Sequence, residues 1–293
     1  MKPARFHYFA PRTLDEALTL LAEQGDGARV LAGGQSLMPL MNMRLVHVSA
    51  LIDLNEIGGL AYIRPWGEEG LALGALTRDA ALEHDTTAAS RLPLLLEASR
   101  YVGHPAIRNR STVGGSIAHA DPAAELPALM LALDAEFEVR SRAGSRTIAA
   151  KDFFQGYLQT SLQDGEILTE LRIPGLPARS GSAFVEFARR EGDYALAGVA
   201  ATLTLGEDGT IAQARLGLCS AGPAPVRAHA AEEALRGQRP GPEAWSVAAA
   251  AVIAELKEPP SDIHGSADYR RHLAGVLTER ALAISAKRAE GSR

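Results

Sequence analysis

The chain has 293 residues, of which 46% are hydrophobic and 22% charged, and these values are ordinary for a globular protein built from two or three subdomains. The formal net charge is −5 at pH 7, so the protein has no overall basic field that would attract nucleic acid. The single cysteine, Cys219, excludes an internal disulfide. It also excludes an iron–sulfur cluster held by this chain alone, because such a cluster takes about four cysteine ligands.

The opening segment lacks the apolar stretch of a signal peptide, and the apolar runs elsewhere are too short to span a membrane. Cys219 lies in the apolar run LGLCSAG, where we interpret it as an inert, packed thiol. The sequence therefore favours a soluble protein of the reducing cytoplasm.

The first predicted element is a helix that begins after Thr13. Thr13 and Glu16 have the spacing of a capping box, and Gly25 follows as a stop signal. Apolar segments at 29–31 and 50–54 then predict two short strands. The residues up to about 56 therefore form a small βα unit.

The middle of the chain alternates short strands and helices. We predict a strand at 71–75, helices from 77 and over 93–102, a hairpin of 137–140 with 146–148, and a strand in GEILTELRIPG. The last third changes character, with strands at 182–188, 195–205 and 211–218 followed by helices near 225–236, 242–256 and 266–290. This order predicts an antiparallel sheet with helices packed on one face.

Two glycine pairs stand out, one in the segment 32–37 (AGGQSL) and one in 111–116 (STVGGS). Paired glycines permit positive φ and place no Cβ in the way of a ligand. Successive backbone N–H groups can then converge on a phosphate. The alternative for each segment is a plain turn between two elements, and the residues alone leave both interpretations open.

Several common site motifs are absent from the sequence. Neither G-x-G-x-x-G nor G-x-x-x-x-G-K-[ST] occurs, which disfavours a Rossmann or P-loop site. His119, Asp121 and Glu125 are close together, but their spacing fits no common zinc pattern, so we predict no metal site. We also predict no catalytic side chain.

The segments AGGQSLMPLMNMRL and TVGGSIAHADPAAELP closely resemble the FAD loops of one family. It is the medium, flavin-binding subunit of carbon monoxide dehydrogenase and related xanthine-dehydrogenase-type molybdenum hydroxylases. The segments FHYFAPRTLDEAL, GEILTELRIP, FARREGDYALAG and SADYRRHLAGVL are similar to the family as well, so the resemblance spans nearly the whole chain.

The resemblance implies an α+β fold with two N-terminal α/β subdomains of the PCMH-type FAD-binding fold and a C-terminal antiparallel sheet with helices. The expected bounds are 1–56, 57–176 and 177–293. FAD would lie between the first two subdomains and touch the third.

Carried over by position, the FAD contacts would come mainly from the two glycine segments, namely Ala32, Gly33, Gly34, Gln35, Ser36, Leu37, Ser111, Thr112, Val113, Gly114, Gly115 and Ser116. Asp121 and Glu125 match positions near the nucleotide half, although they equally suit a helix cap and a helix N-terminus. Ile167 and Leu168 would pack near the isoalloxazine ring, or else belong to a core strand. Tyr194 would shield one flavin face, or else be a core residue.

One position departs from the family. Where xanthine dehydrogenases have a flavin-contacting lysine, this chain has Val185, with Glu186, Arg189 and Arg190 nearby. The polar surroundings of the flavin ring are therefore expected to differ.

The resemblance implies an oxidoreductase subunit that binds FAD and accepts electrons from 2Fe-2S clusters on a small subunit, with a molybdenum cofactor on a large one. A dimer of such heterotrimers is expected, and the overall substrate would be an N-heterocycle, another aromatic or carbon monoxide. The alternatives are a self-contained flavin oxidoreductase of the same fold and a non-catalytic binding or assembly protein.

Overall fold

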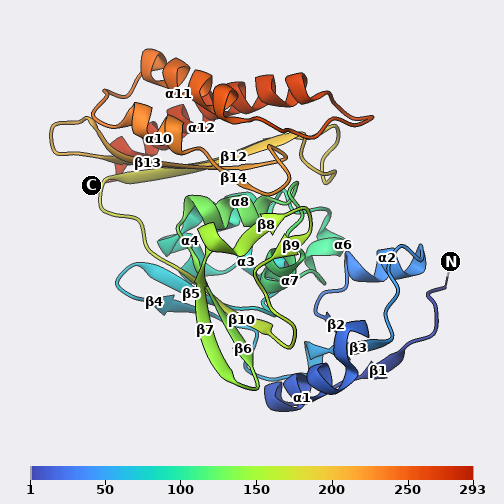
Figure 1. Ribbon diagram of the computed structural model, residues 1–293. Helices are drawn as coiled ribbons and strands as arrows, with labels where there is room; N and C mark the ends of the chain where they lie inside the picture. Colours follow the sequence, from blue (N-terminus) through green and yellow to red (C-terminus); the bar gives the residue numbers. More distant parts are fainter. Residues whose placement is uncertain (1, 293) are drawn as a thin grey trace.

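A computed structural model describes residues 2–292 and has three main sheets arranged along the molecule (Figure 1). The N-terminal sheet is parallel, with the strand order β1-β3-β2. Its strands are β1 (His7–Phe9), β2 (Ala28–Leu31) and β3 (Ala50–Asp53). The short helices beside it are α1 (Leu14–Gln24), α2 (Leu37–Asn42) and the 3-10 turns η1 (Gly25–Gly27) and η2 (Leu54–Glu56).

The middle sheet has five antiparallel strands in the order β4-β5-β10-β6-β7. These strands are β4 (Ile63–Trp66), β5 (Gly70–Gly74), β6 (Glu136–Ser141), β7 (Gly144–Ala149) and β10 (Ile167–Ile173). Around it lie α3 (Asp79–Leu82), α4 (Thr86–Arg91), α5 (Pro93–Ser99), α6 (Pro105–Arg108), α7 (Val113–His119), α8 (Glu125–Ala132), α9 (Ala150–Phe153) and the hairpin of β8 (Phe154–Gly156) and β9 (Gln159–Thr160). Leu, Phe and Ala side chains from the sheet and helices form one continuous core.

The C-terminal sheet is antiparallel and its strands follow chain order: β11 (Ser180–Phe187), β12 (Ala197–Leu205), β13 (Ile211–Cys219) and β14 (Val226–Arg227). One face carries α10 (His229–Leu235), α11 (Pro242–Glu255) and α12 (Ala267–Gly291) (Figure 1). The other face packs against α8 of the middle region. At this contact Gly217 is required, because a Cβ there would overlap the carbonyl oxygen of Ala128. The predicted packing of the C-terminal helices on one face of this sheet is thus confirmed, and the other face is covered by α8 of the middle region (Figure 1).

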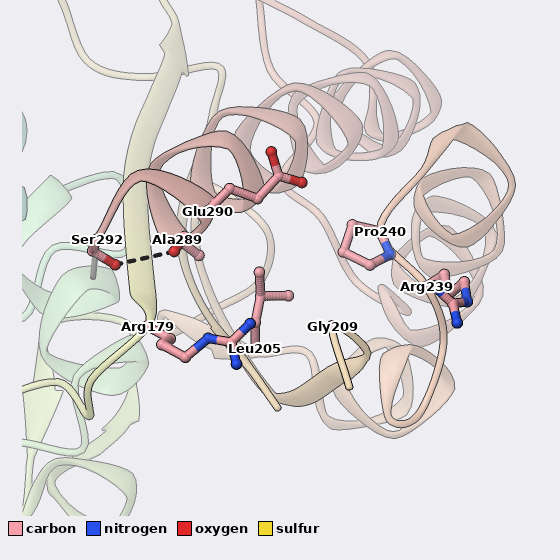
Figure 2. Close-up of a pocket in the computed structure, with 8 residues that line it drawn as sticks. All are labelled: Arg179, Leu205, Gly209, Arg239, Pro240, Ala289, Glu290 and Ser292. Carbon is pink, nitrogen blue, oxygen red and sulfur yellow. Dashed lines mark hydrogen bonds between the residues drawn. The ribbon is translucent and has the colours of Figure 1, made fainter. Parts of the chain in front are cut away.

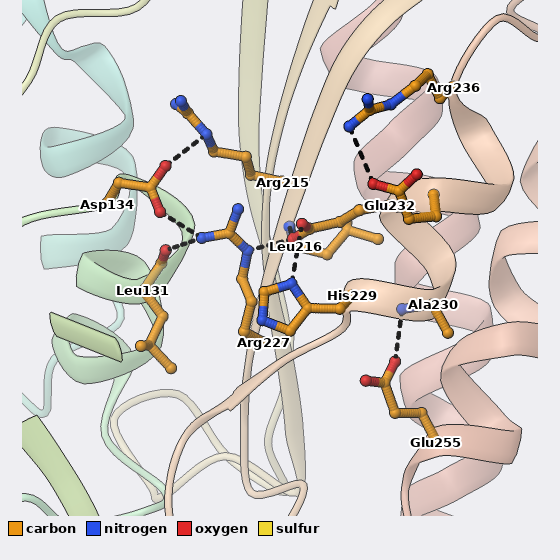
Figure 3. A network of polar contacts seen from close by, with 11 residues as sticks. Leu131, Asp134, Arg215, Leu216, Arg227, His229, Ala230, Glu232, Arg236 and Glu255 are labelled. Carbon is orange, nitrogen blue, oxygen red and sulfur yellow. Dashed lines mark hydrogen bonds and ion pairs between the residues drawn. The ribbon is translucent and has the colours of Figure 1, made fainter. Parts of the chain in front are cut away.

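An ionic network also joins the middle region to the C-terminal sheet (Figure 3). Asp134, which follows α8, pairs with Arg215 at 2.8 Å and with Arg227 at 2.6 Å. Arg227 in turn pairs with Glu232 of α10 and donates to the carbonyl oxygen of Leu131 at 2.7 Å. One carboxylate therefore links two strands that lie far from it in the sequence.

The α+β fold class predicted from the sequence is confirmed, and so are the predicted strands and helices of the last third, each within a few residues, except that β14 occupies the start of the helix predicted at 225–236. The capping residue Thr13 accepts from the N–H of Glu16 at 3.2 Å, and Gly25 ends the helix with φ of 63°. The prediction missed β1 and β4, which are short strands at sheet edges. Within residues 2–292, no helix combines the length and the apolar character that crossing a membrane requires.

Candidate functional site

The two glycine segments contact each other directly in the structure. A Cβ on Gly33 would lie 2.6 Å from the Cα of Ser111 and would also overlap the carbonyl oxygen of Arg110. A Cβ on Gly115 would lie 3.6 Å from the Cβ of Ala32. The turn at 32–37 and the turn at 111–116, although about 80 residues apart in the chain, therefore form one continuous surface.

Two polar side chains that the sequence analysis did not single out fasten this contact. Asn55 Nδ2 donates to the carbonyl oxygen of Ala32 at 2.9 Å. Arg78 donates to Asn55 Oδ1 at 2.5 Å and, through its other terminal nitrogen, to the carbonyl oxygen of Arg110. Asn55 lies just after β3, and a polar residue at a strand end was the only signal that would have drawn attention to it.

The first turn offers free backbone donors. The N–H groups of residues 33–37 donate to no backbone or side-chain acceptor within residues 2–292. Gly34 has φ of 72°, and Gln35 Nε2 closes the turn by donating to the carbonyl oxygen of Gly33 at 2.9 Å. Five successive N–H groups without protein partners, next to the N-terminus of α2, form a nest of the kind that binds a phosphate. The first turn therefore fits a diphosphate.

The segment 111–116 was also expected to offer backbone N–H groups to a phosphate. In the structure its two glycines instead lie at the N-terminal end of helix α7. Thr112 is the N-cap, and its Oγ1 accepts from the N–H of Gly115 at 3.1 Å. The N–H of Gly114 donates to Ala75 at 2.9 Å, and that of Val113 to Thr77, also at 2.9 Å. These donors are already used, so the second turn does not offer its amides as the first does. A Cβ on Gly114 would lie 2.6 Å from the oxygen of Ala75, which shows why glycine is needed for packing.

Asp121 and Glu125 lie in the connection that leads into α8. Asp121 is not the helix cap, because α8 begins at Glu125 with Ala124 as N-cap. Asp121 instead accepts from the N–H of Ala123 at 2.9 Å and closes a short turn. Glu125 is only 7% exposed, and burial, with the charges of Asp79 and Asp121, raises its pKa to about 7. Glu125 is thus a buried carboxyl at a helix N-terminus.

The remaining predicted residues fall into two groups. Ile167 and Leu168 open β10, are 3% and 5% exposed, and belong to two hydrophobic cores. Both residues therefore belong to the core, and only their main-chain atoms can contact a ligand. Tyr194 is 67% exposed in the connection between β11 and β12, so it is not a core residue. An exposed aromatic ring on this connection is available to cover a planar ligand.

A separate pocket of about 630 Å³ lies at the C-terminal sheet (Figure 2). Its lining includes Arg179 and Arg239 together with Glu290 and Ser292 near the end of α12. No residue of either glycine turn lines it. Within residues 2–292, no group of three or more His, Cys, Asp or Glu side chains is arranged to hold a metal ion.

Comparison with known proteins decides the family. Residues 4–176 match the FAD binding domain in molybdopterin dehydrogenase, and residues 182–284 match the CO dehydrogenase flavoprotein C-terminal domain. The chain belongs to the FAD-binding medium subunits of the molybdenum hydroxylases. It is therefore a flavin subunit of an oxidoreductase, and the resemblance seen in the two glycine segments is confirmed.

The similarity extends over the full length of the relatives. The chain is 42% identical to the 6-hydroxypseudooxynicotine dehydrogenase complex subunit alpha of Paenarthrobacter nicotinovorans, covering 100% of this chain and 98% of that one. It is 40% identical to the caffeine dehydrogenase subunit beta of Pseudomonas sp. (strain CBB1), over 98% of this chain and 97% of the relative. Among solved structures, carbon monoxide dehydrogenase from Hydrogenophaga pseudoflava matches with a TM-score of 0.95 at 40% identity, covering 98% and 99% of the two chains.

In this medium subunit, Val185 stands in β11 where xanthine dehydrogenases have a flavin-contacting lysine, and its place in the strand suits an apolar residue. Val185 is half-buried and packs against the core beneath the C-terminal helices. The neighbouring Glu186 points to the opposite face, where a Cβ on Gly198 would lie 3.6 Å from its Cγ. Its Oε2 is buried without a hydrogen-bond partner within residues 2–292, and burial, followed by the charge of Glu125, raises the pKa of Glu186 to about 9. Burial thus raises the pKa of both Glu125 and Glu186 and makes ionisation of both carboxyls less favourable.

Proposed function

We propose that this chain binds FAD through the turn at 32–37 and relays electrons within a heterotrimeric molybdenum hydroxylase. The observation that carries the proposal is the nest of unpartnered N–H groups at 33–37, which lies against the second glycine turn. A diphosphate carries charge that such a nest stabilises.

The two turns have different roles in this proposal. The first turn holds the diphosphate through its amides, with Ala32 to Leu37 along one side. The second turn supports the first, because Gly33 contacts Ser111 and because Gly114 fixes α7 to Ala75, directly after β5. Thr112 to Ser116 line the other side. Tyr194 covers the isoalloxazine ring, and Ile167 and Leu168 face that ring with main chain. Asp121 and the buried Glu125 lie nearby.

We propose three subdomains with bounds 1–56, 57–176 and 177–293, the first two forming the flavin site. When bound, FAD supplies the ability to take up electrons singly and to give them up in pairs. The residues of this chain bind and orient the flavin, and Tyr194 limits the access of water to it. No side chain of this chain acts as a general acid or base in the proposal.

The partners follow from the relatives and from Cys219. One relative is named as a subunit of a dehydrogenase complex and others as a medium chain, and one cysteine cannot hold an iron–sulfur cluster. The complex would contain a large molybdenum-cofactor subunit and a small 2Fe-2S subunit, assembled as a dimer of heterotrimers in the cytoplasm. Co-expression with the two chains and measurement of the mass of the assembly tests this arrangement.

We propose that the complex acts on an N-heterocycle or another aromatic compound. Support comes from relatives named for caffeine and for 6-hydroxypseudooxynicotine, which match over nearly the whole chain. Carbon monoxide is the second candidate, because a similar chain is a carbon monoxide dehydrogenase medium chain. Turnover of the assembled complex on caffeine, nicotine and carbon monoxide separates the two classes.

The central experiment is titration of the purified full chain with FAD, followed by metal analysis. The account predicts stoichiometric flavin with no iron and no molybdenum on this chain. Substrate turnover by the isolated chain would favour a self-contained flavin oxidoreductase. A folded chain that takes up no FAD, alone or in the complex, would favour a non-catalytic binding protein.

A further inference from the structure

The connection that carries Tyr194 is anchored on both sides of that residue. Before it, Gly192 has φ of 80°, and a Cβ there would overlap the ring of His104. After it, the carbonyl oxygen of Ala195 accepts from Ser220 Oγ at 2.6 Å. Tyr194 therefore stands exposed on a connection whose main chain is held on both sides.

Arg270 supplies the third anchor. It lies in the first turns of α12, is only 5% exposed, and donates through one terminal nitrogen to the carbonyl oxygens of Leu196 at 3.0 Å and of Ala195 at 3.5 Å. Its other terminal nitrogen pairs with Asp262 at 2.8 Å. Asp262 also accepts from the N–H groups of His264 and Gly265, which fixes the loop before α12.

This arrangement uses a property that only arginine has. The guanidinium is planar, always charged and carries donors on several sides, so it can bind two carbonyls and a carboxylate together. A buried charge is costly, and Arg270 Nε has no hydrogen-bond partner within residues 2–292. A neutral side chain of similar size would fill this volume without the desolvation cost of a charge. The buried guanidinium is therefore better explained by the carbonyl oxygens to which it donates.

We propose that Arg270 is a positioning residue that holds the main chain after Tyr194, so that the Tyr194 ring stands fixed against the flavin. The inference rests on the proposed FAD site. It also assigns a role to the segment SADYRRHL, which contains Arg270 and lies outside the two glycine turns.

The adjacent Arg271 is a matched control. Its Nε and one terminal nitrogen donate to the carbonyl oxygens of Leu256 and Lys257, each at 2.9 Å, and it pairs with Asp268 at 2.7 Å. The partners are of the same kind as those of Arg270, two carbonyls and a carboxylate, but Arg271 is more exposed, at 28% against 5%, and its carbonyls belong to the loop after α11. Arg271→Met therefore removes an equivalent anchor that has no contact with the Tyr194 connection.

The first test is hydrogen–deuterium exchange of the full chain without FAD. In Arg270→Met, the amides of 192–197 are expected to exchange faster by on the order of tenfold, because local opening there becomes easier. Arg271→Met is expected to leave this segment unchanged. Equal exchange of 192–197 in wild type and Arg270→Met would overturn the anchoring role.

The second test reads the flavin. The FAD-loaded wild type, Arg270→Met, Tyr194→Ala and the double variant are compared by quenching of flavin fluorescence with iodide. Arg270→Met is expected to expose the flavin as much as Tyr194→Ala does, and the double variant no more than either, because both act through one ring. Additive effects, or an unchanged flavin in Arg270→Met, would contradict the proposal.

Two milder variants keep the test valid if Arg270→Met does not fold. Asp262→Asn removes the charged partner of Arg270, and Ser220→Ala removes the separate hydrogen bond to the carbonyl oxygen of Ala195. Both variants loosen the main chain after Tyr194 and are expected to shift both readouts in the same direction. If neither variant changes either readout, the inference fails. If the wild type takes up no FAD, the proposed function fails instead, whatever the exchange data show.

Discussion

Gly33 and Ser111 are so close that a Cβ on Gly33 would lie 2.6 Å from the Cα of Ser111. A contact this short between two main chains leaves no room for any side chain. It brings the free amides of the first turn against the start of α7, which is itself fixed to Ala75 and Thr77 after β5. The geometry of the proposed diphosphate site therefore depends on this close approach.

Gly33→Ala is the first prediction. The added methyl must push the two turns apart, so FAD affinity should fall by about tenfold or more and stability by about 1–3 kcal/mol. FAD titration and thermal unfolding measure the two effects. Gly58→Ala is the control, because a Cβ there meets nothing within 4 Å. Wild-type FAD affinity in Gly33→Ala would contradict the packing of the two turns.

Gly114→Val is expected to abolish flavin retention because it disrupts packing, and not because it blocks a direct contact with the ligand. The added side chain would meet Ala75, whose oxygen accepts from the N–H of Gly114 at 2.9 Å. The variant should therefore lose about 1–3 kcal/mol of stability even in the absence of FAD. Chemical denaturation of the flavin-free protein checks this. Unchanged stability combined with lost flavin would instead favour direct contact between Gly114 and the ligand.

The buried carboxyl of Glu186 predicts a pH dependence. Its pKa in the folded protein is about 9, far above the ordinary value of 4.5, so the folded state holds a proton that the unfolded state releases. This contribution to stability is complete below about pH 4.5 and is lost as the pH rises toward 9. Between these values the folded state binds one more proton at Glu186 than the unfolded state does, so a rise in pH favours unfolding. Stability should therefore decline between these values.

Glu186→Gln isolates this effect. A neutral amide needs no proton, so the variant should be more stable than wild type at pH 8 by about 1 kcal/mol or more, and less dependent on pH. Thermal unfolding from pH 5 to pH 9 measures the difference. Glu207→Gln, an exposed carboxyl in a hairpin turn, serves as the control. Parallel pH profiles for wild type and Glu186→Gln would show that Glu186 is ionised in the folded protein.

Asp134→Asn tests the junction of the middle region with the C-terminal sheet. Asp134 has φ of 49°, which asparagine also tolerates, so the substitution removes charge with little change of backbone. Arg215 and Arg227 then lose their shared carboxylate. Because Asp134 is 48% exposed, the expected loss is about 1 kcal/mol, and it should shrink at high salt.

The control for Asp134→Asn is Glu233→Gln. It breaks the exposed pair of Glu233 with Arg236, which lies within one helix and is expected to contribute little. Urea unfolding at low and high salt compares the two variants. Equal effects would mean that the network at Asp134 contributes no more than an exposed pair.

Much of the fold was predictable because its signals are local. The strands at 197–205 and 211–219 are long apolar runs joined by a Glu-Asp-Gly turn, and the capping residue Thr13 marks its helix clearly. Short edge strands such as β1 and β4 carry few residues and little periodicity, so they become visible only through their pairing, β1 with the distant β3 and β4 with the adjacent β5. The second glycine pair was expected to be a loop, because glycine disfavours helix, but Thr112 caps it and Ala75 holds it.

The candidate site was predictable only in part. The two glycine segments are visible in the sequence, but their contact through Gly33 and Ser111 is a property of the tertiary structure. Asn55 and Arg78, which fasten that contact, belong to no motif. Likewise, the sequence does not tell which face of the sheet Val185 and Glu186 each occupy until the register of β11 is known.

A structure of the full chain with FAD tests the central claim most directly. The account predicts that the diphosphate oxygens lie within hydrogen-bond distance of backbone N–H groups among residues 33–37, with the Tyr194 ring beside the isoalloxazine. A diphosphate bound elsewhere, with these five amides still without a partner, would contradict it.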